Sequence, residues 1–188
     1  MTEPVFRSRW LLCLLLTLLW SSGALARNIT VESVASRIED GQFIVDARLA
    51  VRLNANTSEA LENGVTLEFE LESRLLRPRR FWWDAQVTAT KRRFLLSRHA
   101  LADGYTLSEP DAEHQQTFKD VDAALAALGD VRHFIAGDAA GDKAVKKYRG
   151  RLRLRLDIEA LPAPLRPIAY VSPGWRLSSG WYEWVFVP

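Results

Sequence analysis

Arg151-Leu-Arg-Leu-Arg-Leu-Asp-Ile-Glu159 is the stretch that decides the fold, because charged and apolar residues alternate along it without a break. Successive side chains of a β-strand point to opposite faces, so this segment predicts a strand with one dry face and one charged face. The same alternation runs through residues 42–53 and 65–75. One-sided strands of this kind are typical of antiparallel sheets that cover a core with one face.

Turn signals and one helix complete the predicted architecture. Asp40-Gly41 separates an apolar segment at 30–38 from the strand at 42–53 and predicts a tight hairpin. Residues 118–128 carry apolar side chains at helical spacing, with Thr117 as the expected N-cap. We therefore predict a mainly β protein, an antiparallel β-sandwich of immunoglobulin-like architecture with one inserted α-helix. A β-barrel-like arrangement is the alternative.

Four further segments have weaker patterns. Residues 56–64 predict one or two helical turns, and residues 86–97 predict a strand whose alternation slips at 91–93, as at a bulge or a strand end. Residues 161–174 contain four prolines and predict a loop. Residues 181–187 are apolar on both faces, which fits either a central strand covered on both sides or an exposed partner surface.

The N-terminus has the layout of a secretory signal. Arg7 and Arg9 precede an apolar run at 10–20, and Ala24-Leu25-Ala26 provides small residues for cleavage. The run is about half of the roughly 20 residues that a transmembrane helix needs. We expect a signal peptide at 1–26 and a periplasmic protein with no stable membrane span after cleavage. An inner-membrane protein anchored by an uncleaved signal is the alternative.

Cleavage would leave residues 27–188, a length that suits a single domain with its own core. It would also remove the one cysteine and the one methionine, so the mature domain would have no disulfide and no thiol nucleophile. The net charge of +2 for the full chain would fall by one. So small a charge gives no general attraction to nucleic acid, and we expect no nucleic-acid partner.

No segment carries a recognisable reaction motif. The three histidines, at 99, 114 and 133, lack the spacing of a zinc site. Residues 137–143 resemble a phosphate loop but have one residue too few between the glycines. We predict no catalytic residue, no metal, no cofactor and no enzymatic activity, and a hydrolase assembled from scattered residues is the least favoured interpretation.

A basic and aromatic stretch is the candidate binding site. Arginine and tryptophan lead among the residues that dominate binding energies. The site residues are Arg77, Arg79, Arg80, Phe81, Trp82 and Trp83. In the structural alternative, Phe81 and Trp82 plug one end of the sandwich. The glutamates at 68, 70 and 72 then pair across strands with an arginine row, either the one at 48 and 52 or the one at 151, 153 and 155.

Four stretches carry a resemblance to a known family. They are the Ala-Leu-Ala end of the signal, residues 53–65, Arg79-Arg-Phe-Trp-Trp83 and residues 175–181. Together they resemble an uncharacterised exported family of proteobacteria, known only as domain of unknown function number 4390. The family brings no established activity, cofactor or catalytic residue. Its members are often encoded beside a membrane sensor kinase of nitrogen-regulation type and a ribosomal RNA methyltransferase, which implies a role near an envelope sensor.

Two functions remain open at this point. The first is a non-catalytic periplasmic protein-binding or adaptor domain, whose partner is an envelope or membrane protein such as a sensor. The second is a periplasmic carrier of a small apolar or lipid ligand, with Trp82, Trp83, Trp175, Trp181 and Trp184 as the walls of a cavity between the sheets. The same tryptophans also suit an ordinary core.

Overall fold

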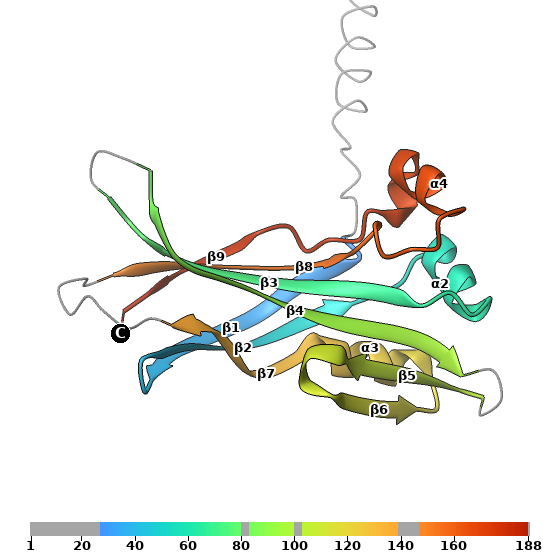
Figure 1. Cartoon of the computed structure of the whole chain (residues 1–188), viewed down its shortest axis with the longest axis horizontal. Helices are drawn as coiled ribbons and strands as arrows, with labels where there is room; N and C mark the ends of the chain where they lie inside the picture. Colours follow the sequence, from blue (N-terminus) through green and yellow to red (C-terminus); the bar gives the residue numbers. More distant parts are fainter. Residues whose placement is uncertain (1–26, 80–82, 100–102, 139–146, 188) are drawn as a thin grey trace, which may run out of the picture.

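The chain folds into two packed β layers in a computed structural model (Figure 1). The structure describes residues 27–79, 83–99, 103–138 and 147–187. The strands are β1 (Ile29–Glu39), β2 (Gln42–Val51), β3 (Leu67–Arg77), β4 (Ala85–His99), β5 (Gly104–Glu109), β6 (His114–Phe118), β7 (Asp130–Asp138), β8 (Tyr148–Leu156) and β9 (Tyr182–Phe186). The helices are α2 (Ala55–Glu62), α3 (Val121–Gly129) and α4 (Arg166–Val171), with single 3₁₀ turns at Pro110–Ala112 and Pro173–Trp175.

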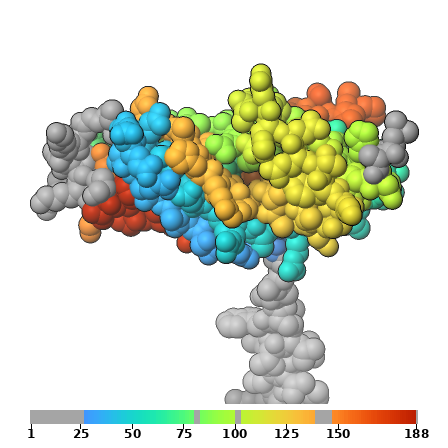
Figure 2. Space-filling model, turned by 90° about the horizontal axis from the view of Figure 1, so that it is seen from below, coloured from blue at the N-terminus to red at the C-terminus, as the bar shows by residue number. Residues whose placement is uncertain are grey.

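The predicted antiparallel β-sandwich is confirmed. One layer is a six-stranded sheet in the order β6-β5-β4-β3-β8-β9, and the other is a three-stranded sheet in the order β1-β2-β7. Helix α3 lies beside the smaller sheet and extends that layer, as the view from below shows (Figure 2). The described strands do not close into a barrel. The large sheet is a meander from β3 to β6 with β8 and β9 added, rather than the four-plus-three division of an immunoglobulin domain.

The core lies between the two layers and comes from the alternating strands. The inward residues of β8, namely Leu152, Leu154 and Leu156, are buried. So are the inward residues of β3, beside β8 in the same sheet, and of β2 in the other layer. The hairpin between β1 and β2 is confirmed at Asp40-Gly41, where φ is 50° and 77°. Two consecutive positive φ values are typical of a type I′ turn, whose twist matches the flanking strands.

Helix α3 is confirmed, but its predicted start is wrong. Asp120 is the N-cap, because its carboxylate accepts a hydrogen bond of 2.7 Å from the backbone N–H of Ala123. Thr117 lies outside the helix, in β6, where it pairs with Thr106 of β5. The pairing of the β5–β6 hairpin thus extends to Phe118 and delays the helix by one turn.

Two other local predictions need correction. The bulge in β4 falls at Val87 rather than at residues 91–93, because Leu75 and Leu76 of β3 pair with Thr88 and Gln86 and skip the residue between them. The proline-rich segment 161–174 is not all loop, since it contains α4. Proline is tolerated in the first turn of a helix, where its missing N–H would have no helical partner.

The apolar C-terminal segment forms an edge strand, not a central one. Strand β9 pairs with β8 alone within its sheet, and Val185 is 67% exposed. The opposite face of β9 ties the layers together. There the Trp184 indole packs on Gly150 of β8 and donates a hydrogen bond of 2.9 Å to the Ser36 hydroxyl of β1.

The two ends of the sandwich differ in character. Helices α2 and α4 lie at one end, and the described part of the β3–β4 hairpin reaches the other (Figure 1). The short helix predicted within 56–64 is confirmed as α2, which begins at an Asn54 cap. Within the described ranges, no helix has the length and apolar character that crossing a bilayer requires.

Candidate functional site

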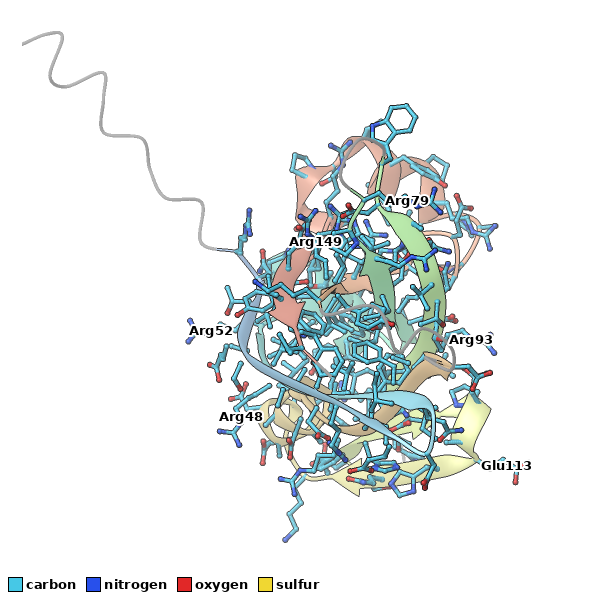
Figure 3. All side chains as sticks on the ribbon, turned by 90° about the vertical axis from the view of Figure 1, so that its left-hand side faces the viewer. Arg48, Arg52, Arg79, Arg93, Glu113 and Arg149 are labelled. Carbon is cyan, nitrogen blue, oxygen red and sulfur yellow. The ribbon has the colours of Figure 1, made fainter. Side chains whose placement is uncertain are left out.

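The hairpin end exposes an aromatic ring, an aliphatic side chain and arginines. We call Arg79, Trp83, Arg149 and Val185 the hairpin-end surface. Trp83 is 88% exposed, and Val185 lies directly opposite Arg149 in the β8–β9 pairing. Figure 3 looks at the molecule from this end, with Arg79 and Arg149 in its upper half. The Arg149 guanidinium donates a hydrogen bond of 2.8 Å to the Asp84 carboxylate, so it contacts the residue next to Trp83.

The predicted site residues differ in their exposure, and three of them lie outside the described residues. Arg77 is partly buried as the last residue of β3, whereas Arg79 and Trp83 are exposed. Arg80, Phe81 and Trp82 lie outside the described residues, so the predicted plug is untested. Arg79 has no ion pair with any residue that the structure describes, which leaves its charge available to a partner.

The other basic residues of this region are engaged in the sheet itself. The outer face of the large sheet carries a row of glutamates on β3 between basic rows on β4 and β8. Glu70 accepts hydrogen bonds from Lys91 at 3.0 Å and Arg155 at 2.8 Å. Glu72 accepts one from Arg153 at 2.7 Å. We call this set the outer ion-pair lattice.

The lattice decides between the two arginine rows considered for the glutamates. Arg153 and Arg155 of β8 pair with Glu72 and Glu70, whereas Arg48 of β2 and Arg52, which follows that strand, are exposed and point away from the molecule (Figure 3). Burial alone would raise the pKa of Glu70, but the hydrogen bonds from Lys91 and Arg155 outweigh burial and lower it. Glu72 behaves in the same way.

The four described tryptophans lie in different environments. Trp175 is in the core, and Trp184 packs on β8. The guanidinium groups of Arg74 and Arg153 lie 4.7 and 4.5 Å from the centroid of the Trp181 ring. Trp83 faces solvent, and Trp82 lies outside the described residues. None of the four described tryptophans lines the hollows found along the β7 side of the sandwich. Trp82 is one of the five residues of the predicted wall, so the carrier hypothesis stays untested.

One polar cluster had no signal in the sequence. Asp46 of β2 accepts a hydrogen bond of 2.7 Å from the backbone N–H of His133, and it also forms an ion pair with Arg37 of β1. His133 has a φ of 48°, at a bulge between β2 and β7. Burial would raise the pKa of Asp46, but these hydrogen bonds lower it. The cluster holds a bulged strand pair in register.

The described residues bring together no group of three His, Cys, Asp or Glu side chains that could hold a metal ion. His99, His114 and His133 are exposed on three different strands.

Fold and site together define a β-sandwich domain with a basic and aromatic end. The chain belongs to the family described as domain of unknown function (DUF4390), whose profile matches residues 26–185. Membership of this family, which the sequence motifs suggested, is thus confirmed. No curated protein and no solved structure matches the chain.

Proposed function

We propose that this chain is an exported, non-catalytic protein-binding domain of the periplasm, which acts as an adaptor for an envelope or membrane protein. The observation that carries the proposal is Trp83, which is 88% exposed at the same end of the molecule as Arg79, whose charge has no ion pair with a described residue. Covering an aromatic side chain removes about 150–250 Å² from water, at roughly 25 cal/mol per Å². A partner that encloses Trp83 therefore gains several kcal/mol.

The geometry of the surface supports a protein partner. Trp83 is next to Asp84 in the chain and Val185 pairs with Arg149, so both apolar side chains belong to residues adjacent to the Arg149–Asp84 ion pair. Arg79 adds a positive charge that has no ion pair with a described residue. Buried aromatic anchors surrounded by polar groups are the usual composition of energetically important interface centres. The complementary surface would be an apolar pocket with an acidic rim. The family resemblance suggests the outer part of a membrane sensor as the protein that carries it.

Crosslinking and affinity capture from an envelope fraction test the proposal. The wild-type protein should recover one dominant partner, and Arg79→Ala/Trp83→Ala should lose it. The matched control is Tyr170→Ala/Arg176→Ala, which removes an exposed aromatic and an exposed arginine at the opposite end, and it should keep the partner. Capture of no protein by an abundant wild type, or undiminished capture by Arg79→Ala/Trp83→Ala, would contradict the proposal.

A further inference from the structure

A second surface feature lies far from the hairpin end, between the two layers. The β4–β5–β6 part of the large sheet and the α3–β7 part of the other layer enclose a cleft with a volume of about 360 Å³. We call it the interlayer cleft. Its volume falls in the range of small-molecule sites, which begins at about 300 Å³.

Arg92 is the most informative residue of the cleft. It is the one member of the run at 91–93 that points between the layers, since Lys91 and Arg93 pair with Glu70 and Asp111 outside. Its side chain is 23% exposed, and its guanidinium lies 4.7 Å from the centroid of the buried Phe134 ring. The ring holds the cation in place without using its N–H groups.

The guanidinium of Arg92 has unused donors. Its one ion pair is with Glu109, at 3.7 Å, and it donates no hydrogen bond to any residue that the structure describes. An arginine carries five N–H donors in a fork that matches a carboxylate in two-point geometry. Donors of a charged group in a cleft that have no protein partner can form charge-assisted hydrogen bonds with a ligand that supplies an acceptor.

The same cleft also offers unused acceptors. The hydrogen bonds from Arg132 both end on one oxygen of Asp130, at 2.7 and 3.0 Å, so the second oxygen accepts none from the described residues. Glu109 accepts no hydrogen bond at all from those residues, and its side chain is 21% exposed. These carboxylates suit a small cation with several donors, such as a primary ammonium group.

Part of the cleft lining is apolar, beside the charged groups and the polar side chains of His114 and Gln116. Phe94 of β4, Leu107 of β5, Ala127 of α3 and Val131 of β7 line it, and all four belong to the core or pack against it. A ligand without an apolar group would leave these apolar side chains exposed to water. An aliphatic group of a few carbons would cover them.

We propose that the interlayer cleft binds a small zwitterion with an aliphatic side chain, the class that free apolar α-amino acids represent. The ligand carboxylate lies on Arg92, the ammonium lies between Glu109 and Asp130, and the side chain covers the floor at Leu107 and Val131. A ligand with one charge only would leave either the donors or the acceptors unmatched. This inference does not depend on the proposed protein partner.

Titration of the isotopically labelled protein with L-leucine, followed by backbone amide NMR, tests the inference. The amide signals of Leu107, Gln116 and Val131 should shift together and saturate. Two comparison probes each lack one charge: 4-methylpentanoate has no ammonium, and isoamylamine has no carboxylate. Each should bind at least tenfold more weakly than L-leucine. Absence of shifts at these amides with millimolar L-leucine, or equal binding of either comparison probe, would overturn the inference.

Variants locate the site. Arg92→Gln and Glu109→Gln should each raise the Kd for L-leucine tenfold or more, because each removes one charge that the ligand meets. Arg93→Gln is the matched control, since Arg93 is the next residue but faces the outside, and its Kd should equal that of the wild type. If Arg92→Gln loses the dispersed spectrum of a folded protein, Glu109→Gln decides alone. An unchanged Kd in the folded variants of Arg92 and Glu109 would place the ligand elsewhere and overturn the inference.

Discussion

Arg149 reaches across from β8 and donates to Asp84 over 2.8 Å, which fastens the base of the β3–β4 hairpin to the neighbouring strand. Trp83 precedes Asp84 directly, so the chain next to the exposed indole is held by a contact outside its own hairpin. A partner that binds Trp83 therefore meets a partly ordered surface, and less conformational entropy is lost on binding.

Two tryptophans of opposite exposure should respond differently to truncation. Trp83→Ala should change the free energy of unfolding by no more than about 0.5 kcal/mol, as expected for an exposed position. Trp175, only 6% exposed, should cost about 3–5 kcal/mol when changed to alanine, because a large buried side chain is lost. Thermal or denaturant unfolding by circular dichroism measures both. A large loss of stability in Trp83→Ala would show that this residue plugs the sandwich and would count against a docking role.

Acid should weaken the fold through the outer ion-pair lattice. Glu70 and Glu72 have pKa values lowered in the folded state, so their contribution is present above the pKa of an unfolded glutamate, about 4.3, and is lost as the pH falls through the lowered values. The melting temperature of the wild type should therefore drop below about pH 4.5.

Glu68 provides a control on the same strand and face. Burial raises its pKa, so its charged form is unfavourable in the folded state. Glu70→Gln should lower the melting temperature at pH 7 and flatten its decline in acid, whereas Glu68→Gln should leave the melting temperature at pH 7 unchanged or raise it. Equal destabilisation by both substitutions at pH 7 would contradict this assignment.

Gly150 should tolerate no larger residue while Trp184 is in place. A Cβ at Gly150 would lie 2.3 Å from the indole, so Gly150→Ala should cost about 1–3 kcal/mol, as overpacking does. In the background of Trp184→Ala the same substitution should cost far less, because the indole is gone. A double-mutant cycle measures this coupling, and additive effects of the two substitutions would contradict the packing.

Export should leave a mature protein that begins at Arg27. N-terminal sequencing of protein from a fractionated cell checks this expectation, which rests on the sequence of residues 1–26. A chain that starts at Met1 and sediments with the inner membrane would establish the anchored alternative.

The sequence predicted well the strands in which apolar and polar residues alternate strictly, because such strands bury one face only. Strand β8 follows its pattern residue by residue, with every second side chain in the core. Strand β6 escaped prediction because four of its five residues are exposed and it has no apolar face. Strand β7 escaped because its alternation is broken at His133 and Gly137, where the backbone has positive φ.

The contacts at the candidate sites depend on strand pairing, which no local pattern contains. Two arginine rows had the period needed to face the glutamates of β3, and only the pairing of Glu70 with Arg155 selects the row on β8. The basic run at 91–93 looked like one patch, yet a strand sends alternate residues to opposite faces and so separates Arg92 from its neighbours. The exposure of Trp83 does not choose between docking surface and plug, because the predicted plug consists of Phe81 and Trp82, which lie outside the described residues.

The position of Trp184 near the end of the chain determines when its contacts can form during synthesis. The indole of Trp184 closes the seam between the two layers by reaching Ser36 on the first strand, yet it belongs to β9, which follows every other described element in the chain. The ribosome therefore synthesises β9 after all the other described elements. Until β9 arrives, the Gly150 face of β8 lacks its cover, so the packing between the two layers can be completed only after the last strand of the described chain has been made.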